Sequence, residues 1–191
     1  MAMKVKGLTD KGSGSYVGNP GVEAGIEPVE RAPRPIDPGV DIGHVHLKAS
    51  DLEKIKAFYV GILGFDVVIE MRGALFIAAG GYHHTLGFNT WESKGGTPPP
   101  PGTTGLYHVA IRYPTRAALG DALRRLRDSG WPIDGFNDHG THEAIYLRDP
   151  EENGLELCWD RPPEEWARDD EGHLTFGNRH LDLAGLLREG E

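Results

Sequence analysis

The sequence contains a single cysteine, Cys158, among its 191 residues. A lone thiol cannot form a disulfide bond within the chain, and residues 1–20 lack the apolar segment that a signal peptide needs. A continuous apolar run of about eighteen residues, which a membrane-spanning helix requires, is also missing. The sequence therefore predicts a protein of the reducing cytoplasm.

Basic side chains are in the minority: 20 Lys and Arg residues stand against 29 Asp and Glu, which gives a formal net charge of -9. This charge repels phosphate backbones and anionic lipid headgroups, so neither nucleic acid nor a membrane surface is an expected partner. The chain also lacks a Walker-type glycine loop and the G-x-S-x-G turn of serine hydrolases. Since 38% of the residues are apolar, an ordinary core can form, and a small-molecule site remains as the expected function class.

Three parts with different patterns follow one another along the chain. Residues 1–40 are rich in glycine and proline and show no sustained hydrophobic period, which indicates an extended arm. Residues 41–160 carry regular strand and helix patterns. Residues 161–191 form an acidic tail with a short helix expected over 181–187. The arm and the tail are candidate contacts for a homodimer.

One β-α-β-β-β pattern occurs twice, in residues 41–93 and 106–160, separated by a Pro/Gly-rich linker over 94–105. The first copy has a helix over 52–63 and strands over 42–49, 65–71, 74–79 and 83–91. The second copy has a helix over 115–127 and strands over 106–113, 131–136, 143–147 and 155–160. These patterns predict an α+β fold in which two tandem modules form a cupped mixed sheet around one site.

Nine histidines are present, and His44 and His108 occupy the same position in the two modules. A pseudo-twofold arrangement would bring them together, which makes them candidate metal ligands. His46 shares a strand face with His44, so alternation alone does not separate the two. The repeat does, because Ala110 stands at the position equivalent to His46. The alternative is that each is an ordinary hydrogen-bonded strand histidine.

Glu156 lies between two leucines on the last predicted strand of the second module. A carboxylate in such a place is costly unless it is paired, protonated or bound to a metal ion. Two histidine nitrogens and one carboxylate suit a divalent transition metal and leave positions open for other molecules. His44, His108 and Glu156 are therefore a candidate metal site. The alternative is an edge-strand glutamate in water.

Four further side chains are candidates for roles near this site. His83 and His84 begin the last strand of the first module, and since neighbouring strand residues point to opposite faces, only one of them should face the site. Tyr146 lies ten residues before Glu156, so a hairpin would place its hydroxyl beside the metal. His139, like His142, falls in a Gly/Asp/Asn-rich turn, where a solvated histidine is the usual case.

The chain resembles the vicinal oxygen chelate superfamily, which includes glyoxalases, bleomycin- and fosfomycin-resistance proteins and type I extradiol dioxygenases. Residues 44–52 and 57–65 resemble the first strand and helix of that family, and residues 81–88 resemble the His-His-Thr run of its extradiol (catechol 2,3-) branch. The extradiol signature is matched by His139, Ile145-Tyr146, Asp149-Pro150 and Glu156. Glu152 departs from it, and familiar extradiol enzymes often have four modules where this chain has two.

This resemblance implies that His44, His108 and Glu156 hold Fe(II), or less often Mn(II). It also implies that His84, rather than His83, is the acid/base group, and that Tyr146 and His139 hold the substrate by hydrogen bonds. The implied function is the ring-opening of a catechol-like aromatic by dioxygen, as in the breakdown of aromatic compounds.

Two other functions of the same fold stay open. A glyoxalase-like isomerase or lyase would need a fourth metal ligand on the last strand of the first module, where the candidates are His83, His84 and Thr85. A non-catalytic protein that binds an aromatic compound or antibiotic would not need the three metal ligands.

Overall fold

The computed structural model describes residues 34–190, so most of the predicted arm lies outside the described residues. Residues 34–42 contain no helix or strand. One compact unit begins at Gly43, and all that follows concerns this unit.

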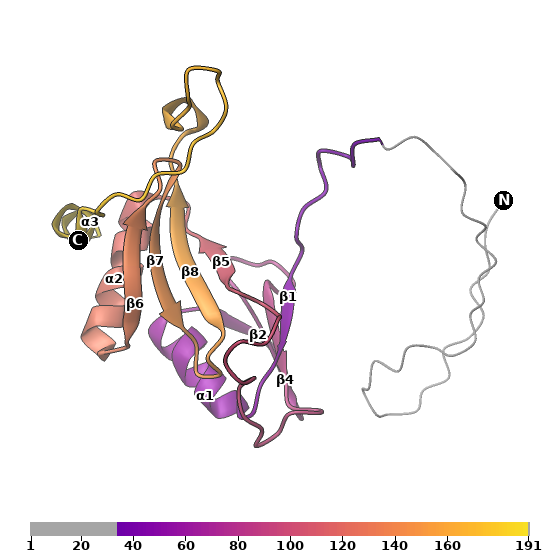
Figure 1. Ribbon diagram of the computed structural model, residues 1–191. Coiled ribbons are helices and arrows are strands. Elements are labelled where there is room, and N and C mark those ends of the chain that lie inside the picture. Colours follow the sequence, from indigo (N-terminus) through magenta and orange to yellow (C-terminus); the bar gives the residue numbers. More distant parts are fainter. Residues whose placement is uncertain (1–33, 191) are drawn as a thin grey trace. The chain divides into compact units, whose positions relative to one another are not determined.

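The two sequence repeats form two four-stranded sheets of identical topology (Figure 1). The first has the order β1-β4-β3-β2 and consists of β1 (Val45–Lys48), β2 (Asp66–Met71), β3 (Ala74–Ala78) and β4 (Leu86–Asn89). The second has the order β5-β8-β7-β6 and consists of β5 (Val109–Arg112), β6 (Ile133–Asp138), β7 (His142–Arg148) and β8 (Gly154–Asp160). In each, the first and last strands run parallel and the other neighbours antiparallel. The predicted α+β fold of two tandem modules is therefore confirmed.

The helix of the first module is not the single α-helix that the sequence predicts. It begins as α1 (Leu52–Lys56), where the Asp51 side chain accepts a hydrogen bond from the Glu53 amide, and continues as a π-helix, η1 (Ala57–Ile62). The wider π-turn accompanies the burial of two adjacent aromatic rings, Phe58 and Tyr59, which are 1% and 0% exposed. An apolar stripe of i, i+3, i+4 spacing does not reveal such a turn.

The second helix, α2 (Arg116–Ser129), follows its prediction closely. Thr115 caps its first turn by accepting a hydrogen bond from the Ala118 amide, and Gly130 ends it in the left-handed conformation with φ 70°. Its buried face joins η1 and one face of each sheet in a single core. The opposite face of each sheet is left outside this core.

The tail folds onto the second module through η2 (Pro163–Glu165) and α3 (Leu183–Glu189). α3 packs against α2 so closely that a side chain at Gly120 would collide with the Leu186 carbonyl. The buried Glu143 carboxylate accepts hydrogen bonds from Arg116 at 2.8 Å and from Arg161 at 2.7 Å, which ties the start of the tail to the sheet and to α2.

The two modules differ at their outer edges. All six residues of β2, the outer strand of the first sheet, are exposed. Beside β6, the outer strand of the second sheet, Arg179 pairs with Asp138 in an antiparallel bridge. Within residues 34–190, no helix is long and apolar enough to cross a membrane.

Candidate active site

Glu156 lies at the centre of β8, where its partners are Ala110 on β5 and Tyr146 on β7. Because β8 is an inner strand, the alternative of an edge-strand glutamate in water is wrong. Leu155 and Leu157 turn into the core, which directs Glu156 to the opposite face, where it is only 6% exposed. A buried carboxylate in this position requires partners.

Two histidines and a tyrosine supply these partners. His108 Nε2 lies 2.9 Å from Glu156 Oε2, and His142 Nε2 lies 2.9 Å from Oε1. The Tyr146 hydroxyl lies 3.3 Å from Oε1. Burial acts to raise the pKa of Glu156, but the hydrogen bonds and the charges of its histidine partners outweigh burial and hold this pKa below its ordinary value. The hydrogen bond to Glu156 in turn raises the pKa of His142.

His142 belongs to this site, although the sequence pattern favoured a solvated turn. It is the first residue of β7, and it shares a strand face with Tyr146, four residues further on. Tyr146 is in register with Glu156. Had the predicted strand begun at residue 142 instead of 143, the alternation of side chains would have placed His142 on the same face as Tyr146 and Glu156.

In the first module, three histidine rings lie close together just before the first residues of β1 and β4. The His84 ring centroid lies 4.4 Å from that of His44, and the His83 centroid lies 6.3 Å from it. Both residues precede β4, and their Nδ1 atoms are 2.9 Å apart, so the expectation that a strand directs them to opposite faces is wrong. Burial, followed by the neighbouring charges of His44 and His83, lowers the pKa of His84.

His46 differs from His44 in a way that alternation did not reveal. The Trp91 amide donates to Asn89 Oδ1 at 3.3 Å, which turns the Asn89 Nδ2 group toward His46 Nε2 at 2.9 Å. An amide nitrogen only donates, so His46 Nε2 accepts and is already occupied. His46 Nε2 is therefore not available to a metal ion.

The three predicted metal ligands are only partly brought together. His108 and Glu156 of the second module face each other, whereas His44 packs against His84 within the first module. Over residues 34–190, no group of three His, Cys, Asp or Glu side chains is arranged to hold a metal ion. The donor types that do meet, imidazole nitrogen and carboxylate oxygen, are ones that suit a divalent transition metal. A divalent cation would also neutralise the buried Glu156 carboxylate.

His139 is held at both of its ring nitrogens and is not a solvated turn residue. Its Nδ1 lies 2.9 Å from the carbonyl oxygen of Gly177, and its Nε2 lies 2.8 Å from the Tyr146 hydroxyl. Burial, followed by the charge of Glu156, raises the pKa of Tyr146 to about 12, so this hydroxyl keeps its hydrogen. The Tyr146 hydroxyl thus lies within hydrogen-bonding distance of both His139 and Glu156, at 2.8 and 3.3 Å.

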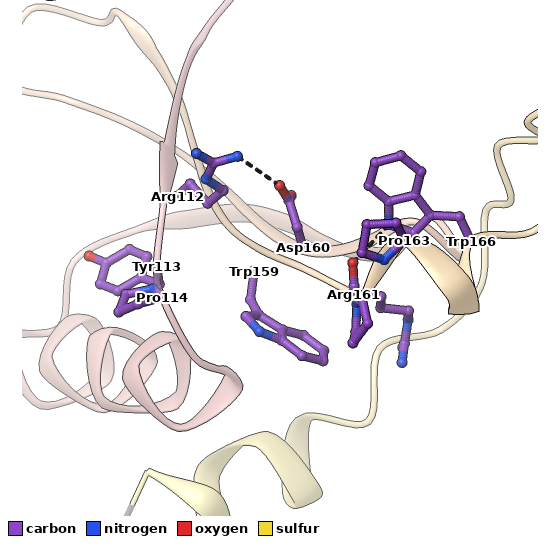
Figure 2. A pocket seen from close by; sticks show the side chains of 9 residues that line it. Arg112, Tyr113, Pro114, Trp159, Asp160, Arg161, Pro163 and Trp166 are labelled. Carbon is purple, nitrogen blue, oxygen red and sulfur yellow. Dashed lines mark hydrogen bonds and ion pairs between the residues drawn. The ribbon is translucent and has the colours of Figure 1, made fainter. Parts of the chain in front are cut away.

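A separate pocket of about 540 Å³ lies at the opposite ends of β5 and β8. Figure 2 shows the Arg112–Asp160 ion pair between Tyr113 on one side and Trp166 of the tail on the other, and the paired atoms are 3.2 Å apart. Neither the predicted metal ligands nor His84, Tyr146 and His139 line this pocket.

Residues 41–157 match the model of the "Glyoxalase/Bleomycin resistance protein/Dioxygenase superfamily". The match covers more than half of the chain and both modules, so the protein belongs to this superfamily. This confirms the resemblance drawn from its strand, helix and signature residues.

Curated proteins similar to the chain include two dioxygenases. It is 38% identical over 148 residues to the catechol-2,3-dioxygenase of Bacillus subtilis, which covers 78% of this chain and 51% of the relative. It is 32% identical over 126 residues to biphenyl-2,3-diol 1,2-dioxygenase 3 of Rhodococcus globerulus, which covers 65% of this chain and 66% of the relative. The chain thus spans between about half and two thirds of these proteins.

Solved structures agree on the fold. A lactoylglutathione lyase from Agrobacterium tumefaciens has a TM-score of 0.51 at 22% identity, with 64% of this chain and 96% of that chain covered. A glyoxalase/dioxygenase from Nostoc punctiforme has a TM-score of 0.54 at 17% identity, with 69% and 100% covered. At these identities, the likeness concerns the fold alone.

Proposed function

We propose that the protein is an extradiol-type dioxygenase that opens the ring of a catechol-like aromatic with O2. The observation that carries this proposal is the buried Glu156 carboxylate, which meets His108 and His142 at 2.9 Å and has the Tyr146 hydroxyl beside it. The 38% identity to a catechol-2,3-dioxygenase supports the same chemistry.

His44, His108 and Glu156 are proposed to hold the metal, Fe(II) first and Mn(II) second. When bound, such an ion lowers the pKa of a catechol hydroxyl that coordinates it and passes electron density from the ring to oxygen. Since His44 and His108 lie in different modules, metal binding would join the two sheets at this site.

The remaining groups are proposed to handle protons and to orient the substrate. His84 packs against His44, and from there its ring can accept a proton and return it as the aromatic ring opens. On the other side, Tyr146 and His139, whose hydroxyl and Nε2 lie 2.8 Å apart, are proposed to hold a substrate oxygen by hydrogen bonds. His142 fixes the Glu156 carboxylate from the side opposite His108.

The glyoxalase-like alternative receives less support from the local geometry. Of the three residues considered as a fourth ligand, none belongs to β4, and His83 and His84 are engaged with each other. The metal content of a His84 variant distinguishes this alternative from the proposed role of His84 in proton transfer.

The test is oxygen uptake by protein that has been loaded anaerobically with Fe(II). With simple and substituted catechols, we expect stoichiometric oxygen consumption and a yellow ring-opened product. The exposed tail histidine His180 provides a matched control, because His180→Ala should keep full activity whereas His108→Ala should lose it. If iron is confirmed in the site and a broad catechol panel gives no oxygen uptake, the proposal is wrong.

A further inference from the structure

The acidic tail reaches the active site through its main chain. Arg179 and Asp138 exchange backbone hydrogen bonds of 3.0 Å in both directions, so this part of the tail extends the second sheet beside the end of β6 (Figure 1). Two residues earlier, the Gly177 amide donates to the His139 carbonyl at 2.8 Å. His139 is therefore bound by the tail before any side-chain contact is considered.

The Gly177 carbonyl then determines which nitrogen of His139 carries hydrogen. A carbonyl oxygen can only accept, so His139 Nδ1, at 2.9 Å from it, must donate. In the neutral ring, Nε2 is then an acceptor. Its partner is the Tyr146 hydroxyl at 2.8 Å, which must donate.

This choice of tautomer affects Glu156. The Tyr146 hydroxyl has one hydrogen and two acceptors within reach, His139 Nε2 at 2.8 Å and Glu156 Oε1 at 3.3 Å. While His139 accepts, the Tyr146 hydrogen points away from the carboxylate. If His139 carried its hydrogen on Nε2, it would donate to Tyr146, and the hydroxyl hydrogen would turn to Glu156.

We propose that the tail segment 177–179 is a positioning element of the active site, which holds His139 as its Nδ1–H tautomer and thereby directs the Tyr146 hydroxyl. The tail is anchored independently of any substrate, since Arg161 binds Asp138 at 3.1 Å and the buried Glu143 at 2.7 Å. This inference rests on the proposed function for its catalytic consequence, but not for the tautomer itself.

Two pairs of variants separate the main-chain effect from side-chain effects. Gly177→Pro and Arg179→Pro each remove an amide that bonds to the end of β6 or to His139. Gly177→Ala and Arg179→Ala are the matched controls, because they keep the amides. The space around Gly177 admits a methyl group, since its nearest neighbours would lie at 3.5 Å.

The first measurement is the tautomer of His139 in the full chain, from long-range nitrogen–proton NMR of protein labelled with ¹⁵N-histidine. Metal-free protein and protein loaded with diamagnetic Zn(II) are both compared, and His139→Gln assigns the signal. We expect the Nδ1–H form in the wild type and in both Ala variants. Both Pro variants should show the Nε2–H form or a mixture, and thermal melts identify any variant that has unfolded.

The second measurement is steady-state oxygen uptake. For the Pro variants, we expect kcat to fall by about 10- to 100-fold with KM changed less than about twofold, since an acid–base contact contributes about 100-fold or more. An Nε2–H tautomer in the wild type, or an unchanged tautomer in a folded Pro variant, overturns the inference. If the tautomer changes as expected but no catechol is oxidised by the wild type, the proposed function fails and the positioning role stands.

Discussion

Tyr59 of the first module donates a hydrogen bond to Asp149 of the second, over 3.0 Å between the phenol oxygen and Oδ2. Both side chains are buried. Asp149 also accepts from the Glu151 and Asn153 amides, and the Glu151 carboxylate accepts from the Ser50 amide and hydroxyl at 2.8 Å. The Asp-Pro turn of the extradiol signature is therefore a joint between the modules.

Removing the Tyr59 hydroxyl should weaken this joint. We expect Tyr59→Phe to lower the free energy of unfolding by about 1–3 kcal/mol, the cost of leaving a buried partner without its hydrogen bond, as measured by urea denaturation. Tyr107→Phe is the matched control, because Tyr107 is 89% exposed and should change stability by less than about 0.5 kcal/mol. An equal loss in both variants would show that Tyr59 makes no special contribution.

The pH dependence of stability should carry the signature of Asp149. Burial raises the pKa of its carboxyl group more than its hydrogen bonds lower it. The folded state therefore favours the protonated form, and the resulting stabilisation is present below the ordinary pKa of about 4 and is lost as pH rises through the folded pKa. Asp149→Asn removes this titration, so the wild type should lose stability relative to the variant as pH rises above about 4.

Asp121 provides a control of opposite sign for that experiment. The hydrogen bond from Arg125 lowers the pKa of Asp121, so its stabilisation is present above the ordinary carboxyl pKa and is lost as pH falls. Relative to Asp121→Asn, the wild type should therefore gain stability with rising pH. The same trend in both comparisons would contradict the environment assigned to Asp149.

The metal should depend on one ligand from each module. We expect His44→Ala, His108→Ala and Glu156→Gln each to reduce Fe(II) affinity by at least about 100-fold, more than the 10- to 100-fold that outer partners contribute. Elemental analysis after dialysis and a competition titration measure this loss. His142→Gln changes a partner of Glu156 and not a proposed ligand, so its loss of Fe(II) affinity should stay within about 10- to 100-fold. Full metal retention in His108→Ala would place the metal elsewhere.

His84 and His83 should separate metal binding from turnover. His84→Phe is expected to keep the metal and to lower kcat by about 100-fold or more, because its proposed role is proton transfer and not ligation. His83→Phe should lower kcat much less, because the His83 ring centroid lies 6.3 Å from that of His44, whereas the His84 centroid lies 4.4 Å from it. Loss of metal from His84→Phe would instead make it a ligand and favour the glyoxalase-like alternative.

The sequence revealed those parts of the fold that depend on local patterns and on repetition. Strand alternation, the helical spacing of apolar residues and the matched positions of His44 and His108 predicted two modules of the observed element order. Neighbours that come from distant segments were not readable in this way. The Asn89 side chain on β4 hydrogen-bonds to His46 on β1, and the Gly177 carbonyl in the tail hydrogen-bonds to His139. Tertiary packing, and not sequence periodicity, brings these groups together.

The two modules differ at their outer strands, β2 and β6. Segment 177–179 covers the end of β6 in the second sheet, whereas all six residues of β2 at the corresponding edge of the first sheet are exposed, including Ile69 and Met71 at 48% and 52%. An exposed outer strand offers unpaired amides and carbonyls to another strand. The two modules are thus unequal: in the second, the tail pairs with the end of the outer strand, whereas in the first the outer strand keeps the capacity to pair with another strand.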